Sequence, residues 1–92
     1  MSQLGQFSGQ GGRLSARIAG AERSLRVVAD KNPKDAETKQ FVAAMTERLR
    51  ALSAAIAAAE NMPGQRRRDA HAAISEQLDG IDADLMARLG VA

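Results

Sequence analysis

Apolar side chains recur along most of the chain at alternating steps of three and four residues, the spacing that places them on one face of an α-helix. Three such stripes follow one another, separated by polar segments that each contain a proline. They predict helices over about residues 13–31, 33–60 and 65–89. The stripes consist of Leu14, Ile18, Ala21, Leu25 and Val28; of Val42, Met45, Leu49, Leu52, Ile56 and Ala59; and of His71, Ile74, Leu78, Ile81 and Leu85.

Several residues at the predicted helix ends favour those boundaries. Asn32 is suited to cap the second helix, with Pro33 at its first position. Residues 61–64 read Asn-Met-Pro-Gly and predict a turn, in which the proline sets the bend and Gly64 accepts a positive φ. Gly90 is placed to end the third helix in the left-handed conformation.

Residues 1–12 differ from the rest of the chain. They contain four glycines and no charged side chain, and glycine loses the most backbone entropy when it is ordered. We therefore expect a flexible tail at 1–12, in which Leu4 and Phe7 could act as a short hydrophobic anchor. A single helical domain is expected at 13–92.

The short connections predict how the helices pack, because they make consecutive helices antiparallel neighbours. The expected fold class is all-α: an up-down-up bundle of three helices, or an extended helical hairpin with a shorter N-terminal helix. Most of the remaining core positions are alanine, whose burial contributes much less than that of leucine. Since the core of a monomer would be thin, we expect self-association to complete the bundle.

Composition supports an all-helical fold and removes several classes of function. Aromatic residues make up only 2% of the chain, which disfavours sheet. Cysteine is absent, which excludes disulfides and thiolate chemistry. The longest apolar run, 54–59, is too short to cross a bilayer. No signal-peptide pattern opens the chain, so we expect a cytoplasmic protein without membrane contact.

The segment 51–59 carries no charge over about two and a half helical turns. A helix that is apolar on every side is usually buried on every side. Alanine is also the best helix former, so the segment could simply be a stable helix. The thin core favours an oligomer contact or a docking groove, and the predicted interface residues are Ala51, Leu52, Ala55, Ile56, Ala58 and Ala59.

The arginines are the most conspicuous polar feature. Arg66, Arg67 and Arg68 lie at the predicted start of the third helix, where the dipole is already positive, so a phosphate or a neighbouring carboxylate should offset them. With Arg13 and Arg17 they form a candidate contact for anions or nucleic acid. The third helix ends in a mainly acidic stretch, so these cations could instead pair within the bundle or across a dimer. Without Trp or Tyr, single-strand binding lacks its stacking platforms, although a duplex backbone needs only Arg and Lys.

No arrangement of residues predicts catalysis. His71 is the only histidine and lies on an apolar stripe, and Glu76 is five residues away and points elsewhere, so the two do not form a metal site. We expect a buried imidazole with one hydrogen bond; the alternative is a pH-sensitive contact at an oligomer interface. No serine has a base and an orienting group at suitable spacing. The chain is therefore predicted not to be an enzyme and to need no metal, cofactor or small-molecule substrate.

Three functions remain as hypotheses. The first is a protein-interaction module, such as an adaptor, chaperone or small inhibitor, whose partner is a second copy, another protein or both. The second is a basic protein that binds the phosphate backbone of nucleic acid through Arg66–Arg68 and the arginines of the first helix. The third is a structural subunit of a helical filament or secretion apparatus, which rests on analogy alone.

Overall fold

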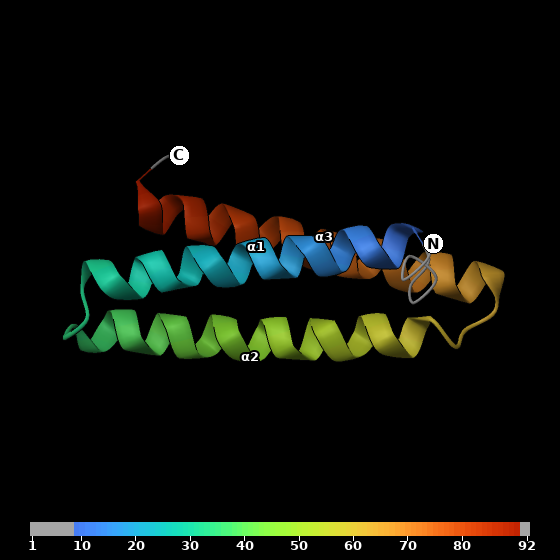
Figure 1. Cartoon of the computed structure of the whole chain (residues 1–92), viewed down its shortest axis with the longest axis horizontal. Coiled ribbons are helices and arrows are strands. Elements are labelled where there is room, and N and C mark those ends of the chain that lie inside the picture. Colours follow the sequence, from blue (N-terminus) through green and yellow to red (C-terminus); the bar gives the residue numbers. More distant parts are fainter. Residues whose placement is uncertain (1–8, 91–92) are drawn as a thin grey trace, which may run out of the picture.

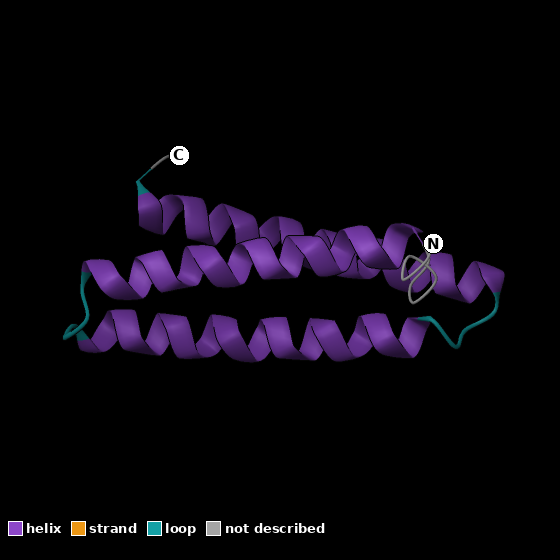
Figure 2. Cartoon of the chain, viewed as in Figure 1, coloured by secondary structure: helices purple, strands orange, loops and turns teal. Residues whose placement is uncertain are grey.

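The computed structural model describes residues 9–90, which form three helices and no strand. They are α1 (Gly9–Lys31), α2 (Ala36–Ala59) and α3 (Gly64–Leu89). Consecutive helices run antiparallel and each contacts the other two, so the chain is an up-down-up bundle rather than an extended hairpin (Figure 1). Short loops connect the helices (Figure 2). The start of α1 and the α2–α3 connection lie at the same end of the bundle, which we call the arginine end because Arg13 and Arg66–Arg68 lie near it.

The core lies where the three predicted stripes meet. Every stripe residue in α1 and α3 is buried, and in α2 the same holds for all but Val42, which is half-buried and packs against the core. Five large side chains from the three helices are almost fully enclosed: Leu14, Leu49, Ile56, Leu78 and Ile81. The all-helical fold and the assignment of the stripes are thus confirmed.

α1 begins earlier than the sequence pattern predicts. Residues 9–12 are assigned to a tail by their glycine content, but they form the first turn of α1, and Gly11 is buried there. Helix propensity is a weak local preference that packing can override. With 23 residues against 24 in α2, α1 is shorter by only one residue. The prediction of a flexible tail for 1–8, including its anchor residues, lies outside the described residues.

α2 is capped by Asp35, so the prediction of an Asn32 cap is wrong. The Asp35 carboxylate accepts hydrogen bonds from the backbone N–H and from the hydroxyl of Thr38, both at 2.8 Å. These bonds, the side-chain bond first, hold the pKa of Asp35 below its usual value. A carboxylate also complements the positive end of the helix dipole better than an amide does. Asn32 and Pro33 lie in the preceding turn, where the Asn32 carbonyl accepts a bond from the Asp35 N–H at 3.2 Å.

The ends of α3 confirm one glycine prediction and correct the other. Gly90 is left-handed, with φ 77° and ψ 24°, and its N–H bonds the Ala87 carbonyl at 3.3 Å. Gly64 is instead the first helical residue, and within residues 9–90 Gly90 alone has a positive φ. The chain changes direction at Pro63, whose extended backbone (φ −71°, ψ 164°) leads directly into the helix.

Candidate functional site

The predicted interface on α2 is divided between the core and the surface. Three of the six predicted interface residues are buried in the core of the chain: Leu52, Ile56 and Ala59. The other three are exposed or half-buried: Ala51, Ala55 and Ala58. The uncharged segment therefore has two faces, one that packs inside the bundle and one that presents alanine methyl groups to solvent.

An open groove between α2 and α3 includes Ala55 and Ala58 of this exposed face but not Ala51. It has a volume of about 310 Å³ and receives no lining residue from α1, so it opens away from that helix. Its lining consists of Leu52, Ala55 and Ala58 from α2, of Met62 from the connection that follows α2, and of Ala70, Ala73, Ile74 and Gln77 from α3. Seven of these eight side chains are apolar and none is charged. We call this surface the α2–α3 groove.

The neighbouring grooves differ from it in charge. The groove between α1 and α2 is lined in part by Glu22 and Arg26. The groove between α1 and α3 is lined in part by Arg17 and Asp82. Charged side chains on a groove keep it hydrated and make the docking of an apolar partner unfavourable. Of these three grooves, the α2–α3 groove is the one suited to an apolar partner.

Charged side chains bridge α2 and α3 beyond the open part of the groove. Arg48 lies 3.9 Å from the carboxylate of Asp84. Further from the arginine end, Arg88 donates a hydrogen bond to Glu37 at 2.6 Å, and its guanidinium lies 4.2 Å from the centre of the Phe41 ring. The bond from Arg88 lowers the pKa of Glu37. Bridges therefore cover the half of this face far from the arginine end and leave the near half open.

Sequence reasoning missed five of the eight residues that line the groove. Ile74 is predicted only as a core residue, and Met62, Ala70, Ala73 and Gln77 belong neither to the predicted interface nor to a predicted stripe. A signal for them does exist, because Ala70, Ala73 and Gln77 repeat at steps of three and four immediately beside the stripe of α3. This row can be recognised as part of a surface only when it is known to lie beside the similar row on α2.

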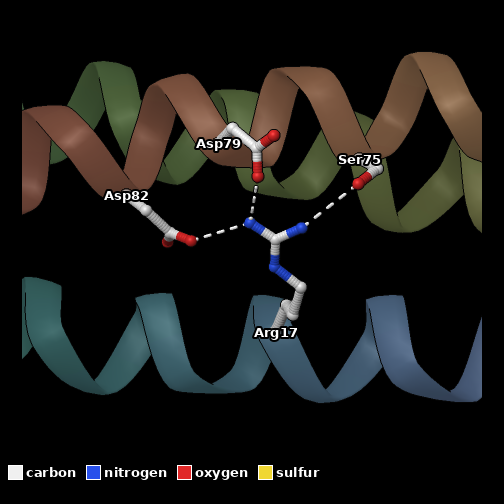
Figure 3. A network of polar contacts seen from close by, with 4 residues as sticks. All are labelled: Arg17, Ser75, Asp79 and Asp82. Carbon is white, nitrogen blue, oxygen red and sulfur yellow. Dashed lines mark hydrogen bonds and ion pairs between the residues drawn. The ribbon is translucent and has the colours of Figure 1, made fainter.

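Arg17 is the centre of a polar network between α1 and α3 (Figure 3). Its Nη2 atom lies 2.8 Å from an oxygen of Asp79 and 2.8 Å from an oxygen of Asp82, and its Nη1 atom donates to the Ser75 hydroxyl at 3.3 Å. The bonds to Asp82 and Asp79 raise the pKa of Arg17. The basic first helix thus pairs here with the acidic third helix, and Arg17 is engaged within the chain rather than available to a phosphate.

We expect Arg17→Ala to lower the free energy of unfolding by roughly 1 kcal/mol, because the Arg17 side chain is still 32% exposed and water screens such pairs. Urea unfolding followed by circular dichroism measures the loss. The difference from the native chain should shrink at high salt. Arg13→Ala is the matched control, since Arg13 bonds only a residue of its own helix among the contacts shown. Equal losses for the two variants would contradict a role of the network in joining α1 to α3.

The other candidate anion contacts lie near the arginine end but point in different directions. Arg66, Arg67 and Arg68 are consecutive, so their side chains leave α3 about 100° apart. Arg66 and Arg68 are exposed and Arg67 is half-buried. Arg68 and Arg13 each donate a hydrogen bond to a glutamine of their own helix, at 3.0 and 3.3 Å. The fold brings these arginines to one end of the bundle without gathering them on one face.

His71 is buried, as its place on the stripe predicts, with 5% of its surface exposed. Its Nε2 atom faces a carboxylate oxygen of Glu60 at 3.6 Å, beyond hydrogen-bond distance. The contact joins the end of α2 to the second turn of α3. The expected hydrogen bond of the imidazole is therefore not made at Nε2, and the residue acts as part of the core.

The described residues lack two features that would suggest other kinds of site. Within 9–90, no three side chains of the metal-ligating types gather in a group that could hold a metal ion. Over the same residues, no helix has the length and apolar character needed to span a membrane. The lining of the α2–α3 groove contains no acid, base or nucleophile, so what it supplies is apolar contact.

Comparison with known proteins gives one match. The model of a family of unknown function (DUF6474) matches residues 1–92 of the chain. No curated protein and no solved structure matches it. The match assigns a family without naming an activity, so the role has to be inferred from the surfaces described above.

Proposed function

The chain belongs to the DUF6474 family, whose function is unknown, and we propose that it is a non-catalytic protein-interaction module. Its docking surface is the α2–α3 groove. The observation that carries this proposal is the contrast along one face of the bundle. Arg48 and Arg88 bridge the two helices in one half, while the lining of the other half is apolar except for Gln77 and carries no charge.

Alanine makes this groove suited to a helix from another protein. A side chain that ends at Cβ lets helix axes approach closely, and the apolar side chains of a docked helix can then contact Leu52 and Ile74 at the groove floor. Adaptors, chaperones and small inhibitors act by holding another protein through such a surface. The proposal covers this class.

The two other hypotheses have less support. A nucleic-acid contact would have to form without Arg17, which two aspartates engage, and with arginines that point in different directions. A filament subunit requires two distinct complementary surfaces on one chain, and no second uncharged groove is found among those described. Both stay predictions that rest on the sequence.

An alanine on the groove and its neighbour off the groove provide a matched test. Ala58 lines the groove, whereas Ala57 is exposed and lies about 100° further round α2. We expect Ala58→Arg to reduce the capture of bound protein by at least about tenfold, because it places a charge and a long side chain in an apolar contact. Ala57→Arg should leave capture unchanged.

The measurement uses the native chain and the two variants as immobilised baits in extracts of the source cell, with the retained proteins quantified by mass spectrometry. Circular dichroism first verifies that all three baits are equally helical. Proteins retained by the native chain and Ala57→Arg but lost with Ala58→Arg support the proposal. Retention of the same proteins by all three baits would show that docking does not involve the groove.

A further inference from the structure

We propose that the occupant of the α2–α3 groove is a second copy of this chain, packed antiparallel about a two-fold axis. This inference rests on the proposed function, that the groove docks a protein. The axis lies across the bundle and passes close to Ala55 of α2 and between Ala73 and Gln77 of α3. In a two-fold contact both copies use the same surface. A residue of one copy therefore faces the residue of the second copy that lies equally far from the axis on the opposite side in the sequence.

The groove-facing side of α3 has the symmetry that such an axis requires. Its residues follow one another at steps of four, three, four, three and four, which reads the same in both directions: Arg66, Ala70, Ala73, Gln77, Gly80 and Asp84. Three of them line the groove, and Asp84 contacts Arg48 across it. About the proposed axis, Ala70 faces Gly80 of the second copy, and Ala73 faces Gln77.

α2 has the same centre. Ala55 lies midway between Arg48, which faces the same side of α2, and Met62, which lines the groove from the turn that follows α2. The contact of Arg48 with Asp84 and that of Glu60 with His71 fix the alignment of the two helices. Between these contacts Ala55 lies level with about residue 76 of α3. One axis can therefore cross the centres of both rows.

Charge decides between the two ways in which the grooves can face each other. A parallel arrangement would put both arginine ends together, so that Arg66, Arg67 and Arg68 of the two copies would repel. The antiparallel arrangement carries Arg66 of one copy to Asp84 of the second copy, once on each side of the axis. Complementary charges fix the register of an interface and like charges exclude the alternatives. The charge pattern thus selects the antiparallel arrangement.

Gly80 fits a close contact between the two α3 helices. It lies in the middle of α3, where glycine disfavours helix relative to alanine. A Cβ at this position would meet no atom of the chain within 4 Å, so packing inside the bundle does not require the glycine. In the proposed dimer Gly80 faces Ala70 of the second copy, and two small residues there allow the helix axes to approach.

Charge exchange tests this arrangement. The mass in solution is measured by size-exclusion chromatography with light scattering over a wide range of concentration, and the native chain is expected at twice 9.7 kDa. Arg66→Asp and Asp84→Arg should each weaken the dimer by about tenfold or more, because each places like charges opposite one another. The double variant restores opposite charges and should recover most of the affinity. Arg68→Asp, about 160° away from Arg66 on α3, is the control and should leave the dimer unchanged.

Three other results would each contradict part of this inference or all of it. A native chain that stays monomeric at millimolar concentration rules out the second copy; if Ala58→Arg still abolishes capture of another protein, the proposed function stands. A dimer that neither single charge variant weakens, or that the double variant fails to restore, rules out the antiparallel arrangement. If the groove variant affects neither mass nor capture, the proposed function fails together with the inference.

Discussion

Ile56→Asp is expected to unfold the chain. Ile56 is 1% exposed and lies in the core shared by the three helices. The substitution removes a buried side chain and leaves an unpaired carboxylate in its place, which together cost roughly 5 kcal/mol or more. That loss is comparable with the whole stability of a small domain, about 5–15 kcal/mol. Far-UV circular dichroism during heating should show a large loss of helix and no cooperative transition.

Ala58→Asp is the matched control, since Ala58 is exposed two residues further along α2. This variant should keep the helical signal and the cooperative transition of the native chain. The pair separates the two faces of the uncharged segment, because the sequence alone would treat both as interface. A folded Ile56→Asp chain would mean that the core does not close around α2 as described.

Leu78→Ala is expected to lower the free energy of unfolding by about 3 kcal/mol, within the range of 2–5 kcal/mol found for buried leucines. Leu78 has no exposed surface and belongs to the cluster that all three helices share. The closely packed side chains around Leu78 can fill the resulting cavity only in part. Urea unfolding at low protein concentration measures the change with the least contribution from association.

Gln77→Ala serves as the comparison for this variant. Gln77 is the exposed neighbour on α3 and alanine is a better helix former, so the free energy of unfolding should change by less than about 0.5 kcal/mol. A loss of less than about 1 kcal/mol for Leu78→Ala would contradict a core in which all three helices meet at this residue.

The helices were predictable because burial imposes a period on the sequence. Positions such as Leu14, Leu49 and Leu78 must face one another, and this leaves steps of three and four that can be read without a structure. The ends of the helices were less predictable. Asn32 and Asp35 are both good capping residues, and the choice between them depends on Thr38, whose hydroxyl and N–H both bond the Asp35 carboxylate.

Only three of the eight groove residues were predictable as an interface, for a related reason. A run of alanines shows that charge is absent but does not show which side of the helix faces the core, so Ile56 and Ala58 look alike in the sequence. Pairing between the basic first helix and the acidic third helix was foreseeable from their charge balance. The sequence did not show which arginine takes part, because this depends on the position of Arg17 along α1, opposite Asp79 and Asp82 of α3.

Docking of a second chain in the α2–α3 groove can be observed at the alanine methyl groups themselves. Protein with isotope-labelled alanine methyls is diluted until light scattering shows a monomer and is then titrated with unlabelled native chain, and the methyl signals are followed by nuclear magnetic resonance. The signals of Ala55, Ala58 and Ala73 are expected to shift or broaden, whereas those of the exposed Ala57 and Ala83 should stay in place. Groove signals that stay unchanged throughout the titration would contradict the claim that a second chain docks between α2 and α3.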